Sequence, residues 1–396
     1  MYQTYNFAMK IALVVYQFIK EKGGVESYVW NASRQLLGYG YEVHIFAHRF
    51  SQDQDKRLFF HHVPAFTFWS PLRYWTFAVN APKIIKKSEV AFDLIHGFTQ
   101  TLSQDIYRVG GGCHWDYMMH TYPLMQSRLG KMLMCLNPRH FSLLLLEKII
   151  LQKKCYKRIT CISEQCKKEL IRHYHLSPDD IEVIHNGVDI RVFTPHNRRT
   201  YRDMVRAQYA IAPDDVLVLF VGSGFKRKGL RHAIIALSLM DTSQKVKVLV
   251  VGKGNVREYQ RFAQKKGVLD KLFFAGVCKQ IHEIYAAGDI FVFPSEYDAF
   301  GTACLEAMAS GLPVIVSKTS GASEIVTHGE DGFIVNHPID AHEIAKYLQA
   351  LLEKGMREQM GAVARQKAER YSFQANIEKT LQVYRKVVAC CIHRNA

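Results

Sequence analysis

The sequence predicts an α/β protein built from two units, each with a parallel sheet. Three observations lead to this prediction. Short apolar, β-prone runs alternate with helical patterns along most of the chain. The alternation is interrupted near residues 189–199, where Pro195 lies in a charged, polar stretch. Glycine-rich or acidic loops follow several of the expected strands. Strands alternating with helices are typical of parallel sheets covered by helices, and 396 residues suffice for two or three domains.

The first unit is expected within residues 1–195. Its helices are predicted at 25–37 and 163–173, after a turn at Gly23 and Gly24. Residues 143–151 form a further apolar helix, interpreted either as a core helix with solvated lysines or as part of an interfacial surface. Its strands are predicted at 10–15, 42–47, 61–63, 94–96, 158–162 and 182–184.

The second unit is expected within residues 196–372, and a final helix over 373–388 lies in the segment 373–396. One further helical pattern opens at Gly301 and is closed by Gly311 and Pro313. The other expected helices are 230–239, 256–265 and 281–287, and the expected strands are 216–221, 247–251, 272–274, 290–293 and 314–317.

The segment 291–314, FVFPSEYDAFGTACLEAMASGLPV, carries the clearest functional signal. It is a strand, then an acidic loop with Asp298, then the helix after Gly301. A helix N-terminus suits a phosphate, and Glu306 lies four residues after Thr302 on the same helix face. Diphosphate at the helix start and ribose hydroxyls on the carboxylate would suit a nucleotide. The structural alternatives are an Asp that caps the helix and a solvated Glu.

This segment resembles the E-x7-E region of the retaining GT-B glycosyltransferases of group 1/family 4. Asp298 stands where that family usually has Glu. Four other segments extend the resemblance along nearly the whole chain: Gly23-Gly24, the run VIHNGVD at 183–189 followed by FTP at 193–195, GSGFKRKG at 222–229 and GASEI at 321–325.

The resemblance implies two Rossmann-like domains facing a central cleft. Residues 1–195 would bind the acceptor, residues 196–372 would bind the nucleotide-sugar, and the segment 373–396 would cross back to the first domain.

The resemblance also assigns roles to individual residues. Arg227 and Lys228 would stabilise the diphosphate leaving group, although a solvated turn pair is the alternative. Glu306 would hold the ribose, and Asp298 is the first acid of the motif. His114, in RVGGGCH at 108–114, resembles a family histidine that touches the donor sugar, and a packed or surface histidine is the alternative. The remaining donor-binding positions offer backbone N–H groups or close approach: Gly23, Gly24, Gly222, Gly301 and Thr302.

The family retains anomeric configuration by a front-face reaction in which the leaving phosphate accepts the acceptor proton, so no general base is expected. No D-x-D metal motif stands out in the sequence, and its nine cysteines show no zinc spacing. We therefore expect no essential metal and no cofactor, because the nucleotide-sugar is a substrate. An odd cysteine count is typical of free thiols in a reducing cytosol.

The net charge of +16 indicates an anionic partner. Between residues 128 and 172, basic residues outnumber acidic ones 11 to 3, with Met, Leu and Phe interleaved. This mixture favours an anionic membrane surface, and no pattern typical of nucleic-acid binding is present.

No apolar run reaches the roughly 20 residues of a membrane span. Residues 1–8 lack secretory-signal features, and Met1 or Met9 is expected to be the start. The expected location is cytoplasmic, peripheral on the inner face of the membrane.

The segments at 108–114 and 222–229 look most like those of lipopolysaccharide core glucosyltransferases. That likeness implies a UDP-glucose-like donor and a lipid-linked, phosphorylated inner-core saccharide as acceptor. Another cell-surface glycan, such as a capsule, teichoic acid or glycolipid, is an alternative, as is a non-catalytic nucleotide-sugar-binding subunit. A nicotinamide enzyme is disfavoured, because the G-x-G runs at 222 and 252 have Arg227 and Arg257 in place of the third glycine.

Overall fold

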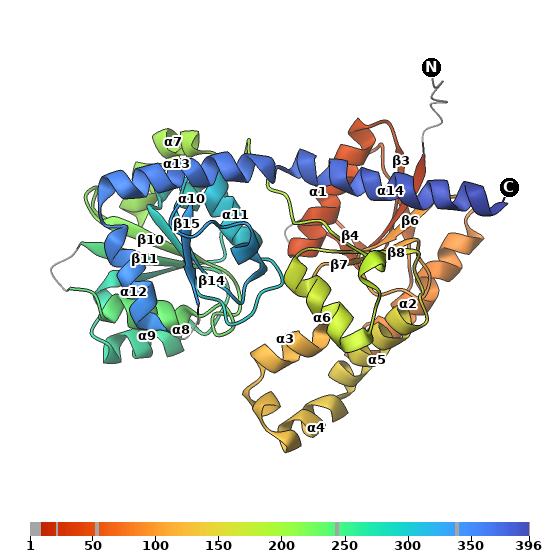
Figure 1. Cartoon of the computed structure of the whole chain (residues 1–396), viewed down its shortest axis with the longest axis horizontal. Helices are drawn as coiled ribbons and strands as arrows, with labels where there is room; N and C mark the ends of the chain where they lie inside the picture. The colour runs from red at the N-terminus through yellow and green to blue at the C-terminus, as the bar shows by residue number, and fades with distance from the viewer. Residues whose placement is uncertain (1–8, 21–22, 52–54, 242–244, 337–339, 396) are drawn as a thin grey trace. The chain divides into compact units, whose positions relative to one another are not determined.

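The computed structural model describes residues 9–20, 23–51, 55–241, 245–336 and 340–395. The chain divides into two compact units, one of residues 1–184 with 376–396 and one of residues 185–375 (Figure 1). Each unit has a parallel sheet with helices packed on it, as the alternation in the sequence predicts. The predictions for residues 1–8 lie outside the described residues.

The first unit has a sheet of seven strands among its described residues, in the order β5-β3-β1-β6-β7-β8-β9. Its helices are α1 (Gly24–Gly38), α2 (Ser70–Lys87), α3 (His114–Thr121), α4 (Arg128–Leu136), α5 (Pro138–Gln152) and α6 (Glu164–Tyr174). The strands are β1 (Lys10–Val14), β3 (Glu42–Ala47), β5 (Phe59–His62), β6 (Leu94–Gly97), β7 (Ile106–Val109), β8 (Arg158–Cys161) and β9 (Ile181–Val183); β2 (Gln17–Phe18) and β4 (Arg49–Phe50) pair separately.

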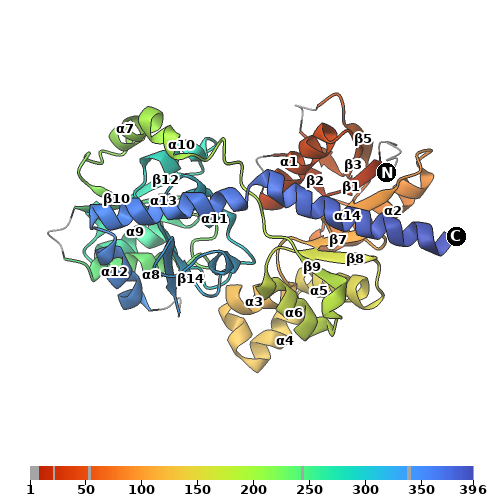
Figure 2. The same ribbon diagram turned by 45° about the horizontal axis from the view of Figure 1, so that its top comes forward.

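The last helix, α14 (Phe373–Asn395), belongs to the first unit from residue 376 onward. Two buried hydrogen bonds attach it there. The Tyr28 hydroxyl donates to Asn376 Oδ1 over 2.8 Å, and the Tyr384 hydroxyl lies 2.7 Å from His96 Nδ1. Figure 2 shows α14 beside α1 and α2 of this unit.

The second unit has a six-stranded sheet among its described residues, in the order β12-β11-β10-β13-β14-β15. Its helices are α7 (Arg198–Gln208), α8 (Leu230–Ser238), α9 (Val256–Lys265), α10 (Ile281–Ala287), α11 (Thr302–Ala309), α12 (Ala341–Ala350) and α13 (Lys354–Arg370). The strands are β10 (Val216–Val221), β11 (Val246–Val251), β12 (Leu272–Gly276), β13 (Ile290–Phe293), β14 (Val314–Ser317) and β15 (Gly332–Val335).

The strand order of the second unit fixes where a ligand is expected. From β10 the chain builds outward through β11 and β12, and then returns to place β13 on the other side of β10. Such a reversal opens a crevice at the carboxyl ends of the two central strands. The loops that begin at Gly222 and Pro294 follow β10 and β13, so they flank this switch point.

Most expected elements are confirmed to within two residues. The strand expected at 61–63 is found at 59–62, and the final helix continues to residue 395. Several elements were not predicted, namely β7, β15, α2, α3, α4 and α7. The apolar helix at 143–151 is the second half of α5, with Leu146, Ile150 and Leu151 in the core of the first unit.

Candidate active site

The two basic residues of the 222–229 loop and the first acid of the signature loop form one cluster at the switch point. The Asp298 carboxylate accepts hydrogen bonds from the Lys228 ammonium and, over 3.1 Å, from Arg227 Nη1. The backbone N–H of Phe300 donates to its other oxygen over 3.1 Å. Two cations around one carboxylate leave a net positive charge of one at the carboxyl ends of β10 and β13.

The ionisation of this cluster follows from burial and charge together. Burial alone would raise the pKa of Asp298, but the Lys228 ammonium and the Arg227 guanidinium outweigh it and hold that pKa below its ordinary value. Burial lowers the pKa of Lys228, and the attraction of Asp298 opposes this effect. The carboxylate therefore favours the charged form of this partly buried lysine.

Glycines make room for the cluster. A Cβ on Gly222 would lie 3.2 Å from Cγ of Lys228, whose side chain passes over this position. Gly229 has φ +78°, and a Cβ there would lie 1.8 Å from the carbonyl oxygen of Pro294. The loop after β10 therefore packs directly on the loop after β13.

The signature loop is held rigidly by its neighbour after β14. The Ser317 and Thr319 hydroxyls both donate to the carbonyl oxygen of Ser295, over 2.5 and 2.7 Å. Asp298 itself is paired by backbone hydrogen bonds with the segment from Thr319 to Gly321. These contacts fix the carboxylate that holds the two cations.

Helix α11 begins directly after this loop. Gly301, its N-cap, has φ +88°, and a Cβ there would lie 2.8 Å from the Phe293 ring, so a side chain would strain the helix start. The Thr302 hydroxyl accepts a hydrogen bond from Asn186 Nδ2 over 3.1 Å. The helix start therefore lies at the carboxyl edge of the sheet, as the sequence predicts.

Glu306 lies one turn into α11 and is partly buried. The Tyr285 hydroxyl donates to Glu306 Oε2 over 3.0 Å. Burial raises the pKa of Glu306 to about 7, and the hydrogen bond from Tyr285 only partly opposes it. This carboxyl therefore changes charge near neutral pH, which is typical of a functional carboxyl and rare for a solvated one.

His114 belongs to the first unit and begins α3. Its Nε2 lies 3.1 Å from His140 Nδ1, and its backbone N–H donates to the buried Glu147 carboxyl over 3.2 Å. Burial, followed by the charge of neighbouring His140 and Arg139, lowers the pKa of His114 to about 4. The imidazole is therefore neutral at pH 7 and can exchange hydrogen bonds with a hydroxyl group.

Gly23 and Gly24 also belong to the first unit, at the start of α1. Both are exposed. A Cβ on Gly24 would meet no atom within 4 Å, whereas one on Gly23 would meet the flexible end of the Glu26 side chain. The backbone of Gly24 is therefore open to a ligand within its own unit.

A buried polar group lies near His114. Cys113, Asp116 and His173 each offer one possible ligand atom, and these three atoms lie within 4.8 Å of one another. Asp116 already accepts from Arg172 over 2.6 Å and lies 2.7 Å from His173 Nε2. Burial raises the pKa of the Cys113 thiol. Hydrogen bonding and ion pairing account for this group.

Within the second unit, the structure brings the predicted cations, the loop acid, the helix start and Glu306 to one edge of the sheet. His114, Gly23 and Gly24 lie in the first unit and are described there alone. Sequence reasoning missed Tyr285 and Glu147, the partners of Glu306 and His114. No motif marks either residue, because each contact is made only by tertiary packing.

Two family profiles match the chain. "Glycosyl transferases group 1" matches residues 202–367, and "Glycosyltransferase Family 4" matches residues 22–192.

The chain is also similar to several curated proteins. A D-inositol 3-phosphate glycosyltransferase of Corynebacterium aurimucosum is 27% identical over 92% of this chain and 91% of its own length. Lipopolysaccharide glucosyltransferase WaaG of Escherichia coli is 22% identical over 95% and 98%. An uncharacterised glycosyltransferase of Methanocaldococcus jannaschii is 29% identical over 58% of this chain, and the match spans 60% of that relative's length. Two other relatives, D-inositol 3-phosphate glycosyltransferases of Streptomyces bingchenggensis and Paenarthrobacter aurescens, match over 52% and 55% of their length.

Solved structures share the fold. A crystal structure of WaaG, a glycosyltransferase involved in lipopolysaccharide biosynthesis, superimposes with a TM-score of 0.80 at 20% identity, covering 94% of this chain and 99% of that one. The structure of Anabaena HepE in complex with UDP-glucose has a TM-score of 0.69 at 18% identity, over 95% and 100%. With both profiles together covering most of its length, this chain belongs to the group 1/family 4 glycosyltransferases and has their GT-B fold.

Proposed function

We propose that this glycosyltransferase moves a hexose, with retention of anomeric configuration, from a UDP-glucose-like nucleotide-sugar to a lipid-linked saccharide. The observation that carries the proposal is the Lys228–Asp298–Arg227 cluster at the switch point of the second sheet. Cleavage of the anomeric C–O bond releases a nucleoside diphosphate, so negative charge develops on the leaving oxygen. Preorganised cations near that oxygen stabilise the transition state.

In this proposal Asp298 positions the two cations and does not itself contact the sugar. Its carboxylate is buried and engaged by Lys228, Arg227 and the Phe300 N–H. An incoming diphosphate would meet the outer donors of Arg227 and Lys228. First-turn N–H groups of α11, which have no acceptor within the helix, would supply further donors.

Glu306 would accept hydrogen bonds from the two ribose hydroxyls, with Tyr285 holding the carboxylate in place. A neutral His114 would exchange a hydrogen bond with a sugar hydroxyl, and Gly24 would offer its backbone N–H to the diphosphate. Gly222 allows the Lys228 side chain to pass close to the loop after β10. The leaving phosphate would accept the acceptor proton, so no protein base is assigned.

The names of the relatives support the donor and acceptor classes. WaaG is a lipopolysaccharide glucosyltransferase, and HepE was crystallised with UDP-glucose. Several other relatives are named D-inositol 3-phosphate glycosyltransferases. A small phosphorylated acceptor is therefore the second candidate. Both acceptors are anionic, which suits a chain of net charge +16.

A membrane surface is the proposed location of the lipid-linked acceptor. None of the described helices is long and apolar enough to cross a membrane. In the first unit, α4 buries Met134 against Met118 and Met125 and exposes its other face. In Figures 1 and 2, α3 and α4 extend away from the sheet of this unit. The α4 patch consists of the exposed residues Leu124, Leu129, Met132, Leu133, Leu136 and Phe141.

Cations border the α4 patch, namely Arg128, Lys131 and Arg139. An apolar helix face with a basic border is typical of docking on anionic lipid. Further along the expected basic flank, Lys154 and Lys157 are engaged by Asp180 and Asp105 at 2.9 and 2.7 Å. We therefore place the proposed membrane contact, on the cytoplasmic face, at the α4 patch.

A two-step experiment tests the proposed function. Thermal unfolding with UDP, GDP, ADP, CMP and their sugars identifies the donor, because a ligand that binds only the folded state raises Tm. Transfer of the matched sugar is then measured to a lipid-linked inner-core saccharide, a glycolipid and D-inositol 3-phosphate. Transfer to the lipid-linked saccharide, lost in Glu306→Ala, is expected. Binding without transfer or donor hydrolysis would instead identify a non-catalytic binding subunit.

A further inference from the structure

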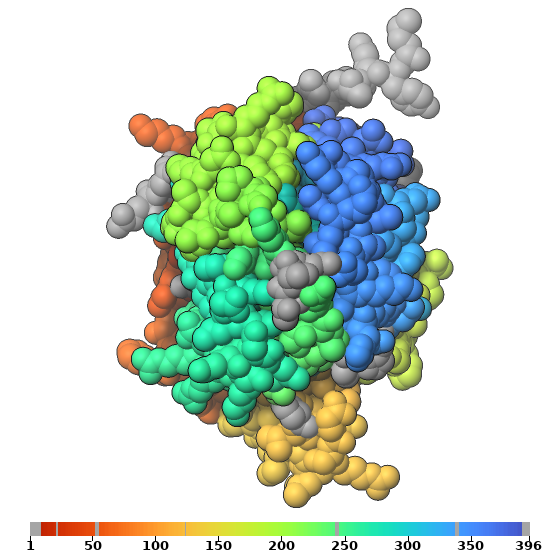
Figure 3. Space-filling view, turned by 90° about the vertical axis from the view of Figure 1, so that its left-hand side faces the viewer, coloured from red at the N-terminus to blue at the C-terminus, as the bar shows by residue number. Residues whose placement is uncertain are grey.

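A second basic site lies in the second unit, at the opposite edge of its sheet from the Lys228–Asp298–Arg227 cluster. It is a pocket of about 540 Å³. Asp289, which directly precedes β13, lines it, as do Gly311 and Pro313, which precede β14. Figure 3 shows the face on which the yellow-green α7 region borders the blue α12–α13 region.

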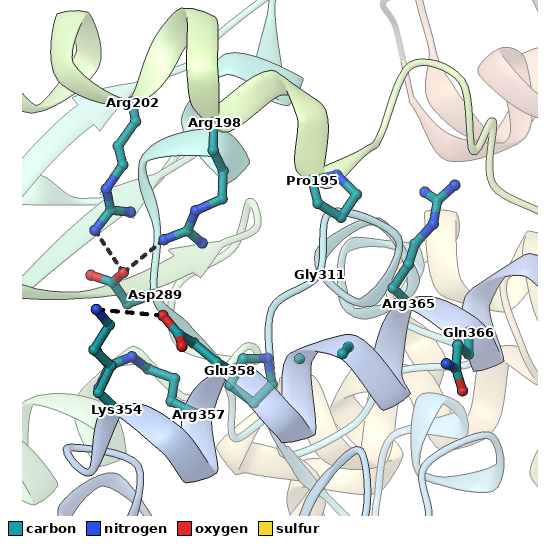
Figure 4. Close-up of a pocket in the computed structure, with 13 residues that line it drawn as sticks. Pro195, Arg198, Arg202, Asp289, Gly311, Lys354, Arg357, Glu358, Arg365 and Gln366 are labelled. Carbon is teal, nitrogen blue, oxygen red and sulfur yellow. Dashed lines mark hydrogen bonds and ion pairs between the residues drawn. The ribbon is translucent and has the colours of Figure 1, made fainter.

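Helix α7 supplies one wall of the pocket. Arg198 and Arg202, one turn apart, both donate to Asp289 Oδ1, over 3.0 and 2.8 Å (Figure 4). Arg206, one further turn along, donates to Asp289 Oδ2 over 2.5 Å. A single carboxylate, which is 5% exposed, therefore faces three guanidinium groups.

Helix α13 supplies the other wall. Lys354 and Glu358 lie 3.8 Å apart with both side chains largely exposed, and Arg357 lies beside them (Figure 4). Arg357 Nη1 donates to the carbonyl oxygens of Leu351 and Leu352. Burial lowers the pKa of Arg198, the charge of Arg202 lowers it further, and the attraction of Asp289 opposes both. Arg357 on α13 also lowers this pKa, more weakly, so the charges of the two walls act on each other.

Helix capping explains part of this charge. Helix C-termini gather at this edge of a parallel α/β sheet, and each carries about half a negative charge. The carbonyl oxygens at the ends of α10 and α12 accept from Arg202 and Arg357. Arg365 caps α11 and is neutralised by Glu369 at 2.9 Å.

Capping does not balance the pocket. Five cations remain. Arg198, Arg202, Lys354 and Arg357 line the pocket. The buried Arg206 does not line it but shares the Asp289 carboxylate. Against them stand the carboxylates of Asp289 and Glu358 and two helix ends of about half a charge each, so an excess of about two positive charges is left.

We propose that this pocket binds a small dianionic phosphate group, as a phosphate monoester or inorganic phosphate, between the α7 arginines and Lys354. Guanidinium groups suit phosphate oxygens because their planar N–H donors match them in pairs. The contacts to Asp289 and the carbonyls leave N–H donors on both Arg198 and Arg202. A pocket of about 540 Å³ also admits the remainder of a phosphorylated sugar or similar metabolite.

The test is calorimetric titration of inorganic phosphate and of glucose 6-phosphate into the whole protein at constant ionic strength. Lys354→Glu should weaken the affinity by roughly fivefold to tenfold, since it reverses a charge at the rim. Glu358→Gln should strengthen it by roughly twofold to fivefold. Both side chains are exposed, so neither change should affect folding. Lys265→Glu on the exposed end of α9 changes the net charge equally and is the matched control.

The expected pattern is opposite shifts in the two pocket variants and none in Lys265→Glu. Tighter binding of glucose 6-phosphate than of inorganic phosphate would identify a monoester site, and equal binding a site for phosphate alone. Absence of binding, or equal weakening in Lys354→Glu and Lys265→Glu, would overturn the proposal. UDP affinity should be the same in the wild type and both pocket variants, so a failure here is distinguishable from a failure of the donor site.

Discussion

At the scale of single residues, the chemistry depends on how burial and charge set the ionisation of a few side chains. Lys228 is partly buried, and the Asp298 carboxylate favours its charged form. The shorter acid at 298 therefore has a direct physical role in this chain: it reaches both cations from a loop fixed by Ser317 and Thr319.

Asp298→Asn should acid-shift the pH range of donor binding. Without the carboxylate, burial lowers the pKa of Lys228 unopposed, so the ammonium loses its proton at a lower pH than in the wild type. Donor affinity is measured by titration calorimetry from about pH 6 to pH 9. As pH rises, the affinity of the variant should begin to decline at a lower pH than that of the wild type. An affinity reduced equally at every pH would contradict the positioning role.

Glu306→Gln should remove a pH dependence of donor binding. The carboxyl has a pKa of about 7 in the free protein, and only its ionised form accepts from both ribose hydroxyls. Wild-type affinity for a nucleotide-sugar should therefore rise between about pH 6 and pH 8, whereas the variant should bind weakly and evenly. Nucleotide-sugars suit this measurement because both phosphates are diesters that do not titrate in this range. A variant that keeps the wild-type slope would rule out the ribose role.

Glu147→Gln should change how stability depends on pH. Burial raises the pKa of Glu147 from 4.5 to about 7, against the opposing His114 N–H bond. The folded state therefore binds a proton on Glu147 more tightly than the unfolded state does. The stabilisation that results is complete below the unfolded-state pKa of 4.5 and is lost as pH rises through the folded-state pKa of about 7. Relative to the variant, the wild-type free energy of unfolding should fall by on the order of 3 kcal/mol across that window. Urea unfolding at several pH values measures it, and a constant difference would contradict this.

The candidate site could be predicted only in part from the sequence. Lys228, Asp298 and Glu306 lie in motifs with fixed spacing, so sequence reasoning finds them. Tyr285 cannot be found this way, because it reaches Glu306 from α10, a different helix with no motif of its own. The role of Asp298 as a counter-ion also required the structure, since it depends on two loops that are about 70 residues apart meeting at one edge.

At the scale of elements, most strands were predictable from the sequence, whereas β7 and β15 were not. The strand β10, VLVLFV, reads directly as a core strand. The strand β7, IYRV, contains Arg108, and its guanidinium is buried over the Tyr28 ring at 3.9 Å. Such a strand forms because tertiary packing accommodates the charge, a contact that a local pattern does not encode. Short helices such as α3 and α4 likewise depend on packing of their methionines.

The α4 patch should bind anionic membranes through both of its features. Vesicles containing anionic lipid should retain the protein and release it at high salt, because screening weakens each contact of about 1 kcal/mol. Reversing Arg128 and Lys131 to Glu should weaken sedimentation with vesicles, as should Leu129→Ser with Leu133→Ser. Donor affinity should not change in either variant.

The matched control reverses Lys154 and Lys157, which are already engaged by Asp180 and Asp105. This control should affect vesicle binding less than the α4 variants do. Equal binding to neutral and anionic vesicles, or a larger effect of the control pair, would contradict the assignment to the α4 patch.

At the scale of the whole molecule, part of the net charge of +16 is concentrated in the three sites for which we propose anionic ligands. The cluster at Lys228 is suited to a diphosphate, the pocket between α7 and α13 to a phosphate group, and the border of α4 to a lipid surface. Each site combines cations with a different degree of burial, so each should respond differently to salt.

The central claim is that the Lys228–Asp298–Arg227 cluster holds the diphosphate of a nucleotide-sugar. Its most direct measurement is calorimetric titration of the cognate nucleoside diphosphate and its phosphate-free nucleoside into wild type, Lys228→Ala and Arg227→Ala. The diphosphate should lose roughly a hundredfold in affinity in each variant, the effect of about 3 kcal/mol at a charged contact, while the weak binding of the nucleoside is unchanged. Equal affinity of the diphosphate for all three proteins would contradict the account.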